Sequence, residues 1–504
     1  MVGDGTTGRD SEISGETRFR GNGSGSQSLR STVAARAARS AESKAAHREG
    51  RQEGGSGKDG MRQSEEREVT EVPAGAKQVA DAPINKWKWV EATVWTDRML
   101  AALGNGVKGN KWFSLIDKVH RPATLKSAWS RVKANRGAAG VDGQSIVKFA
   151  AREEAYLGEL ETALRDGSYR PQPVKRVEIA KADGKLRPLG IPTVKDRVVQ
   201  MAVKLVIEPI YENLFLDTSY GFRPGRGCKD ALREVDRQLK DGNVWVVDAD
   251  LKAYFDSIPH DRLMGRVEEQ ISDGKILSLI ESFLKQDIMK GLERWTPTGG
   301  TPQGGVISPL LANLYLHPLD EKMRKLGYNM VRYADDFVIL SPTQAQAERV
   351  LEEVRAWVKE NGLSLHPDKT RMGNCMEKGQ GFEFLGYRFE CGQRHVRKKS
   401  LKALYDKIRE KTRRTSGSSL KWIVSELNPS LRGWFNYFQH AHPHTFWGID
   451  GFMRRRMRAI LRKREKRPGF GRTHDDHRRW PNAYFAALGI FTMKEAHALA
   501  SQSR

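Results

Sequence analysis

Two short apolar runs enclose a pair of adjacent aspartates near residue 335. Met330 to Tyr333 and Phe337 to Leu340 each have the length and composition of a buried strand, and Ala334-Asp335-Asp336 lies between them. Only a tight hairpin joins two strands over so short a distance. The sequence therefore predicts an antiparallel strand pair that carries carboxylates at its tip.

A second predicted strand also ends in acids. Val244 to Val247 form a compact apolar run that leads directly into Asp248-Ala249-Asp250. Polymerase-type phosphoryl transfer needs two divalent cations about 3.5–4 Å apart, and Mg²⁺ prefers carboxylates held on rigid elements. Acids at strand ends can also be solvated turn residues. Their occurrence after two buried-type strands in a basic protein favours a metal site that joins Asp250 to Asp335 and Asp336.

Apolar spacing predicts two long helices. In residues 344–361 the apolar positions recur at intervals of three and four, with Thr343 placed to cap the start and Gly362 the end. Residues 196–208 are predicted to form a buried helix that ends at Pro209.

Further strands complete the predicted sheets. Val174 to Ile179 is strand-like, Asp183-Gly184 is a hairpin signal, and Leu186 begins the return strand. Residues 382–389 alternate as one strand would, and helices predominate from about residue 400. The order of elements indicates an α+β fold with a mostly antiparallel sheet.

Charge is distributed very unevenly along the 504 residues. The net charge is +24, yet residues 1–83 are balanced and contain one aromatic, Phe19, so we expect a disordered leader there. Residues 393–504 hold 26 Lys and Arg against 8 Asp and Glu. Such an excess indicates a polyanionic partner, most simply nucleic acid. No apolar stretch reaches the roughly 18 residues that a membrane helix needs, and no secretory leader is evident.

Several sequence blocks, taken in order, resemble the reverse transcriptases encoded by group II introns. Tyr333-Ala334-Asp335-Asp336 is similar to the family's Tyr-x-Asp-Asp signature, and Asp250 to Ile258 resembles its first acidic motif. Other similar blocks are Gly140-Val141-Asp142-Gly143, Arg187 to Pro192, Asp196 to Gln200, Gly221 to Arg226, Thr301 to Pro309, His366 to Thr370 and Phe384 to Tyr387.

This resemblance implies a right-hand polymerase with an antiparallel sheet in the palm, followed by an all-α basic maturase domain. The implied divisions are an N-terminal extension and fingers at 84–240, a palm at 241–390, a helical thumb at 391–426 and a maturase domain at 427–504, with fingers and palm together covering about 120–390. No Cys-pair/His array follows the maturase block, so no endonuclease domain is expected.

The resemblance also implies catalytic roles for particular residues. Asp250 and Asp335 match the principal metal ligands, Asp336 the accompanying acid and Leu251 a carbonyl ligand, which together would hold two Mg²⁺ ions, with Mn²⁺ as a substitute. Lys369 matches a lysine that protonates the leaving pyrophosphate. Seen without the family, a lysine after Pro-Asp is usually a surface residue.

Four further residues match positions that contact the nucleotide. Phe255 matches a steric gate that excludes the ribose hydroxyl, and Gln303 a glutamine beside the incoming dNTP. Lys185 and Arg187 match finger residues that grip the triphosphate, which guanidinium suits because it binds phosphate bidentately. The alternatives are an ordinary core residue at Phe255, a simple tight turn at Gln303 and solvated charges at Lys185 and Arg187.

A basic segment lies near the C-terminus. Residues 452–467 combine apolar positions with a cluster of cations, and the alternatives for them are a solvated helix face, a membrane-surface helix and a phosphate-binding helix. With a polymerase upstream, we favour RNA binding by Arg454, Arg455, Arg456, Arg458, Arg462 and Lys463.

The sequence therefore predicts an RNA-directed DNA polymerase that copies its group II intron RNA into DNA and assists intron splicing. Its expected partners are the intron RNA, a DNA primer or target and dNTPs, with no membrane. We expect a bacterial cytoplasmic protein at the nucleoid. Two alternatives are a free-standing reverse transcriptase used in DNA repair or host defence, and an RNA-binding splicing factor with a relic polymerase.

Overall fold

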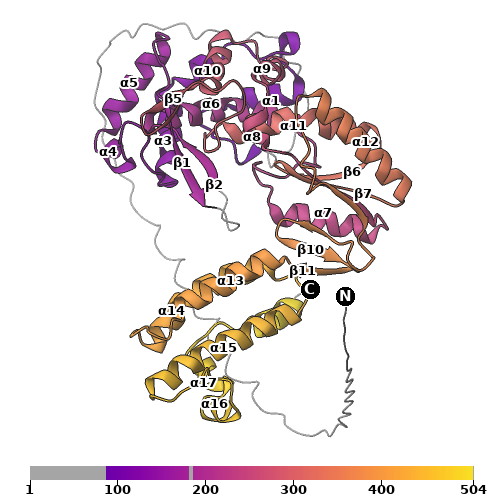
Figure 1. Ribbon diagram of the computed structural model, residues 1–504. Helices are drawn as coiled ribbons and strands as arrows, with labels where there is room; N and C mark the ends of the chain where they lie inside the picture. Colours follow the sequence, from indigo (N-terminus) through magenta and orange to yellow (C-terminus); the bar gives the residue numbers. More distant parts are fainter. Residues whose placement is uncertain (1–86, 181–185, 503–504) are drawn as a thin grey trace, which may run out of the picture. The chain divides into compact units, whose positions relative to one another are not determined.

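A computed structural model describes residues 87–180 and 186–502 (Figure 1). The predicted leader at 1–83 lies outside these residues. The N-terminal helices are α1 (Asp97–Asn105), η2 (Lys108–Asn110), α2 (Ile116–Val119), α3 (Pro122–Ala134), α4 (Ile146–Ala150), α5 (Glu153–Arg165) and α6 (Val194–Glu212). The later helices are α7 (Cys228–Lys240), α8 (Tyr254–Ser257), α9 (His260–Glu268), α10 (Gly274–Leu284), α11 (Ser308–Lys325) and α12 (Gln344–Glu360).

The predicted helix at 196–208 forms, but the expectation that it ends at Pro209 is wrong. α6 continues to Glu212 and is buried along almost its whole length. Pro209 cannot donate the backbone bond that the Leu205 carbonyl would receive in a regular helix. That carbonyl accepts the indole N–H of Trp95 instead, at 3.1 Å. Because its acceptor is satisfied, the helix passes through the proline without an unpaired buried group.

The first sheet has the strand order β2-β1-β4-β5. The predicted hairpin is confirmed, since β1 (Val174–Ala180) pairs antiparallel with β2 (Leu186–Ile191) and places Ile179 opposite Arg187. Its predicted turn at Asp183-Gly184 lies outside the described residues. β4 (Ile288–Lys290) runs parallel to β1, and β5 (Glu293–Trp295) returns beside β4.

The central sheet has the order β6-β7-β3-β8 and is antiparallel throughout. Its strands are β6 (Asn329–Tyr333), β7 (Asp336–Ser341), β3 (Trp245–Asp250) and β8 (Arg371–Asn374). Side chains alternate between its faces. Val247 and Ile339 join the core that includes α12, whereas Val246 and Leu340 join the core that includes α7. The sheet therefore separates two hydrophobic cores, with α12 and α7 on opposite sides of it (Figure 1).

The helix predicted at 344–361 is confirmed as α12. The Thr343 hydroxyl accepts a hydrogen bond from the Gln346 backbone N–H at 3.3 Å, and Gly362 follows the helix with φ of 70°. This helix lies against β3 and β7, where it closes one core. Both predicted caps therefore form as expected.

The single strand expected at 382–389 is wrong, because this segment is a hairpin. β9 (Phe382–Phe384) pairs with β10 (Tyr387–Glu390), and β11 (Gln393–Val396) completes a third sheet. The turn residues Leu385 and Gly386 have φ values of 47° and 85°, the left-handed conformation that a two-residue turn requires. Apolar alternation resumes after the turn, so the sequence pattern resembled one uninterrupted strand.

Helices alone follow β11 in the described chain, as predicted. They are α13 (Lys398–Lys411), α14 (Leu420–Phe438), α15 (His444–Arg464), α16 (His474–Arg479), α17 (Asn482–Ala487) and α18 (Met493–Gln502). Residues 426 and 427, at which the sequence divides thumb from maturase, both lie within α14. No helix among the described residues is both long and apolar enough to cross a bilayer.

Candidate active site

Acidic residues from two strands meet at one edge of the central sheet. Asp250, the last residue of β3, lies directly opposite Asp336, the first residue of β7. Tyr333 pairs with Asp336 across the β6–β7 hairpin, so Ala334 and Asp335 form its two-residue turn. The hairpin predicted from the apolar runs is therefore confirmed, and its tip lies beside the end of β3.

Gly221 and Arg332 hold the turn that carries Asp335 in its conformation. Ala334 has φ of 61°, a conformation that costs a non-glycine residue roughly 1–3 kcal/mol. A Cβ on Gly221 would clash with the Ala334 backbone, so only glycine lets residue 221 approach this turn. The fully buried Arg332 donates to the Ala334 carbonyl at 3.0 Å and to Asp320 at 2.7 Å. Backbone packing and a buried ion pair together hold the strained turn in place.

Burial and the repulsion of neighbouring carboxylates raise the pKa values of Asp248, Asp335 and Asp336. The pKa of Asp336 rises to about 7, chiefly through burial and then through the charges of Asp335 and Asp250. Asp248 lies on the same face of β3 as Asp250, and burial with the charges of Asp336 and Asp250 raises its pKa to about 7 as well. Burial and the charge of Asp250 also raise the pKa of Asp335. A divalent cation would relieve this repulsion, and carboxylate oxygens are the donors that Mg²⁺ prefers.

The carboxylates are not arranged as a finished metal site. Among residues 87–180 and 186–502, no group of three or more His, Cys, Asp and Glu side chains is positioned to hold a metal ion. The Asp250 carboxylate instead accepts a hydrogen bond from Lys369 Nζ at 2.9 Å, with both side chains partly exposed. The structure thus brings Lys369 to the acids, where it neutralises one of them.

The backbone carbonyl of Leu251 points toward the side of β3 on which β7 lies. Leu251 and Leu365 form an isolated antiparallel bridge, and the His366 N–H donates to the Asp250 carbonyl at 2.8 Å beside it. The Lys252 N–H donates to the Ser364 carbonyl on the other side of the bridge, so Leu251 and Leu365 are a non-hydrogen-bonded pair and the backbone groups of each point away from the other. The Leu251 carbonyl therefore points toward the side on which Asp336 lies.

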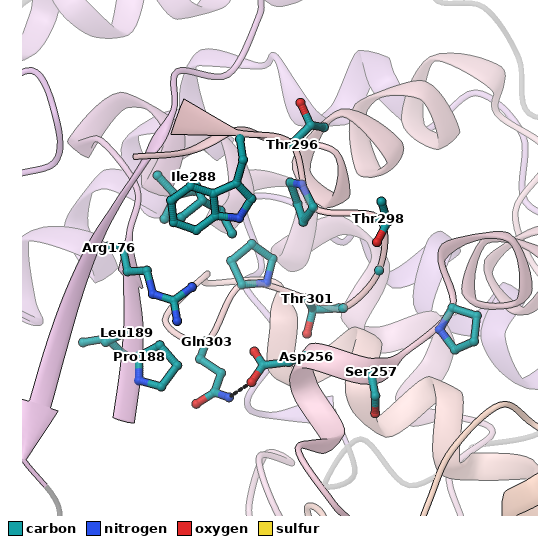
Figure 2. A pocket seen from close by; sticks show the side chains of 18 residues that line it. Arg176, Pro188, Leu189, Asp256, Ser257, Ile288, Thr296, Thr298, Thr301 and Gln303 are labelled. Carbon is teal, nitrogen blue, oxygen red and sulfur yellow. Dashed lines mark hydrogen bonds between the residues drawn. The ribbon is translucent and has the colours of Figure 1, made fainter. Parts of the chain in front are cut away.

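A hydrogen-bonded chain of three side chains lies between the first sheet and α8. Arg187 Nε donates to Gln303 Oε1 at 3.1 Å, and Gln303 Nε2 donates to Asp256 Oδ2 at 3.0 Å. Figure 2 shows the second of these bonds. Arg187 and Gln303, two of the residues predicted to contact the nucleotide, are therefore hydrogen-bonded to each other. Lys185, the third, lies outside the described residues.

A cavity of about 700 Å³ opens beside this chain (Figure 2). The Arg176 guanidinium lies over the Trp295 ring, 5.5 Å from its centre, and both residues line the cavity together with Asp256 and Gln303. Its volume falls within the roughly 300–1,000 Å³ that small-molecule sites occupy. A flat aromatic and guanidinium wall beside an amide suits a nucleotide.

Phe255 lies on α8, and its backbone bonds to the loop that leads to Gln303. It follows Ala253, whose φ is 49°, and its carbonyl accepts the Thr301 N–H at 2.7 Å. Its ring is half-buried, packs on the main core and meets Tyr254 edge-on, with ring centres 5.6 Å apart. The predicted gate residue is therefore also part of the core.

Comparisons with known proteins decide the family. The family model described as "Reverse transcriptase (RNA-dependent DNA polymerase)" matches residues 179–389, and "Group II intron, maturase-specific domain" matches residues 401–480. "Protein YkfC" of Escherichia coli (strain K12) is 37% identical over 316 residues, which cover 54% of this chain and 82% of that protein. The chain belongs to the group II intron-encoded reverse transcriptases and maturases.

A second curated relative is matched over a smaller share of its own length. "Group II intron-encoded protein LtrA" of Lactococcus lactis subsp. cremoris is 37% identical over 266 residues, which cover 52% of this chain. The chain spans only 40% of that relative's length. Among solved structures, a chain of the "Partial Cas6-RT-Cas1--Cas2 complex" aligns over 49% of this chain and 41% of its own, with 23% identity and a TM-score of 0.31. The maturase match favours the intron-encoded reading over a free-standing reverse transcriptase.

The cationic residues of α15 for which RNA binding is predicted differ in what they contact. Three of them bond within the chain: Arg456 donates to the Thr412 carbonyl at 2.6 Å, Arg458 to the Trp480 carbonyl at 2.9 Å, and Arg462 to Asp476 at 2.6 Å. The other three lack such partners among the described residues: Arg454 and Lys463 form no ion pair, and Arg455 stacks on Phe452.

Sequence reasoning assigned no role to several residues that shape this site. Asp248 shares a face with Asp250, and only the period-two alternation of β3 signals it. Asp256 was part of a recognised motif, but its bond to Gln303 joins distant segments. Arg332 is buried in a predicted strand, and nothing in its local sequence indicates that its partner is Asp320.

Proposed function

We propose that this chain is an RNA-directed DNA polymerase that copies its own intron RNA into DNA and assists the splicing of that RNA. The observation that carries the proposal is the position of Asp250 directly opposite Asp336, with Asp335 in the adjoining turn. Family membership supports both activities. We expect the protein in the bacterial cytoplasm at the nucleoid, together with a DNA primer or target and dNTPs.

Asp250, Asp335 and the Leu251 carbonyl would hold two Mg²⁺ ions, or Mn²⁺, with Asp336 as the accompanying acid. When bound, such ions activate the primer hydroxyl and stabilise the leaving pyrophosphate. The protein contributes rigidity, because the strands fix Asp250 and Asp336, while Arg332 holds the turn of Asp335. The repulsion among the acids supports this assignment.

Arg187, Gln303 and Phe255 would position the incoming dNTP. The Arg187–Gln303 bond supports this role, because it brings a guanidinium group and an amide together. A guanidinium group can bind phosphate bidentately. Phe255 would exclude a ribose hydroxyl through its ring. Increased ribonucleotide incorporation by a Phe255→Val variant would measure this role. Lys185 is proposed as an additional phosphate contact on the family resemblance alone.

Lys369 would protonate the departing pyrophosphate. The bond from its ammonium group to Asp250 supports this role, because it puts a proton donor beside the acids. The same ammonium group would neutralise Asp250 until substrate arrives.

We also propose the division of the chain into fingers (84–240), palm (241–390), thumb (391–426) and maturase domain (427–504). The match of the maturase model to residues 401–480 supports a separate RNA-binding role for the C-terminal helices. These helices would bind intron RNA and present it to the polymerase site.

The first test is primer extension by an Asp335→Asn variant. Loss of a metal ligand removes several kcal/mol of transition-state stabilisation, so extension of a DNA primer on an RNA template should fall about a thousandfold or more. An Asp475→Asn variant is the matched control, because Asp475 is an exposed carboxylate on α16. Normal extension by Asp335→Asn protein would disprove the metal assignment.

A further inference from the structure

A second cavity, of about 310 Å³, lies on α15. Arg454, Arg455 and Arg458 line it from the helix, and Arg472 and His477 line it from the segment that follows. The remaining lining residues are Gly451, Gly471 and Asn482, so none of the lining residues is acidic. The cavity is thus a strongly basic hollow distinct from the polymerase site.

The cavity is formed where the loop at Gly471 packs closely against α15. Gly451, Arg454, Arg455 and Arg458 recur at helical spacing and therefore share one face of α15. Gly471 has φ of 74°, and a Cβ there would clash with the backbone of α15, so this glycine brings the following loop directly onto the helix. The cavity is a defined feature of the fold.

Arg458 lines the cavity and is held in place by hydrogen bonds within the chain. Its side chain is buried, and it donates to the Trp480 carbonyl at 2.9 Å and to Asn482 Oδ1 at 3.0 Å. In contrast, Arg454 and Arg472 form no hydrogen bond or ion pair with other described residues. The charge of Arg454 acts on Asp450, four residues earlier on α15, without a bond between them. The N–H groups of both guanidinium groups can therefore bond to a ligand.

The nearby carboxylates are already engaged. Asp450 accepts the backbone N–H groups of Met493 and Lys494, at 3.1 and 3.0 Å, at the start of α18. Asp476 accepts from Arg462 at 2.6 Å. Positive charge therefore accumulates at the cavity: burial, and then the charge of Arg458, lower the pKa of His477. An anion would relieve this repulsion.

We propose that this cavity binds a phosphate group of RNA through Arg454 and Arg472. The inference rests on the proposed RNA binding by the C-terminal helices and assigns it to particular side chains. Two free guanidinium groups suit a phosphate, because each donates two parallel N–H groups to its oxygens. Arg456, Arg458 and Arg462 hold the fold, whereas Arg454 and Arg472 contact the ligand.

A substitution at Gly451 tests the proposal without removing any arginine. A Cβ at residue 451 meets no atom within 4 Å, so the helix accepts a side chain there. Gly451→Glu places a carboxylate at the cavity, and Gly451→Ala is the matched control. The affinity for a fluorescent RNA stem-loop is measured across a range of salt concentrations. Gly451→Glu should weaken binding on the order of tenfold and lower the salt slope by about one, while Gly451→Ala binds as the unmodified protein does.

Arg454→Ala should reproduce the effect of Gly451→Glu. The control is Arg478→Ala, since Arg478 is 73% exposed, pairs with Asp475 and does not line the cavity. Stem-loops with a 5′-phosphate and with a 5′-hydroxyl distinguish the source of the phosphate. Equal weakening with both assigns an internal phosphodiester, whereas weakening only with the 5′-phosphate assigns the terminal group.

The outcomes separate this inference from the proposed function. If the unmodified protein binds RNA and Gly451→Glu protein binds it equally, with the same salt slope, the cavity assignment is wrong and RNA binding stands. If the unmodified protein does not bind the stem-loop or extend a primer on RNA, the proposed function itself fails.

Discussion

At the acidic edge of the central sheet, carboxylates from two strands crowd together, whereas on α15 guanidinium groups crowd around a cavity. Burial and like charges raise the pKa of Asp336 to about 7 in the first region. In the second, burial and neighbouring cations lower the pKa of His477. Each region concentrates one sign of charge, so each favours a ligand of the opposite sign: a divalent cation at the sheet and a phosphate on α15.

Each region also has a nearby ion pair in which both partners are side chains of this chain, so that no ligand is needed to balance the charge. Arg332 and Asp320 are both fully buried under the hairpin turn, and Arg462 pairs with the buried Asp476 near the basic cavity. The comparison teaches that a buried charge with a buried or half-buried partner supports the fold, whereas a group of charges of one sign that repel one another indicates a binding site. Stability measurements can test this distinction.

The largest effect on stability is expected for the buried pair. Arg332→Ala leaves the Asp320 carboxylate buried without its partner, which should lower the free energy of unfolding by about 3–5 kcal/mol. Urea denaturation measures the loss. The double variant Arg332→Met/Asp320→Leu removes both charges and should recover most of it. A loss below about 1 kcal/mol in the single variant would show that the pair is not structural.

An effect of opposite sign is expected for a crowded acid. Because Asp248 has a pKa of about 7 when folded, the folded protein binds a proton there that the unfolded chain releases near pH 4. Stability should therefore fall as pH rises from about 4 to 7. At pH 8 in EDTA, Asp248→Asn should stabilise the protein by about 1–2 kcal/mol. Denaturation curves measure this, and a destabilised variant would contradict the repulsion.

The smallest stability effect is expected at Lys369. Its bond to Asp250 joins side chains that are 55% and 40% exposed, so Lys369→Gln should change the free energy of unfolding by less than about 1 kcal/mol. Primer extension should nevertheless fall about a hundredfold, since general acids contribute that much or more. Lys359→Gln is the control, with an exposed lysine in the last turn of α12. Equal extension by both variants would remove Lys369 from the mechanism.

Local sequence patterns were sufficient to predict several elements of the fold. The apolar spacing of α12 and its caps at Thr343 and Gly362 predicted that helix correctly, because a helix on a core depends on its own periodicity. The apolar runs around Asp335 likewise predicted the hairpin. The sequence failed where distant contacts decide: at Pro209, Trp95 supplies the replacement hydrogen bond.

The sequence by itself determined the helix at 344–361, the hairpins around Asp335 and after Val174, the acidic residues at Asp250, Asp335 and Asp336, and the basic C-terminal end. Motifs and periodicity are local properties, so they can be read along the chain. Only the tertiary structure decided which charged side chains can bond to a ligand and which are already bonded within the chain. Arg454 and Arg458 lie one helical turn apart on α15. Arg458 donates to the Trp480 carbonyl from a later segment, whereas Arg454 has no hydrogen-bond partner in the part of the chain that the structure describes. Partners that come from remote residues leave no local signal, because folding alone brings them together.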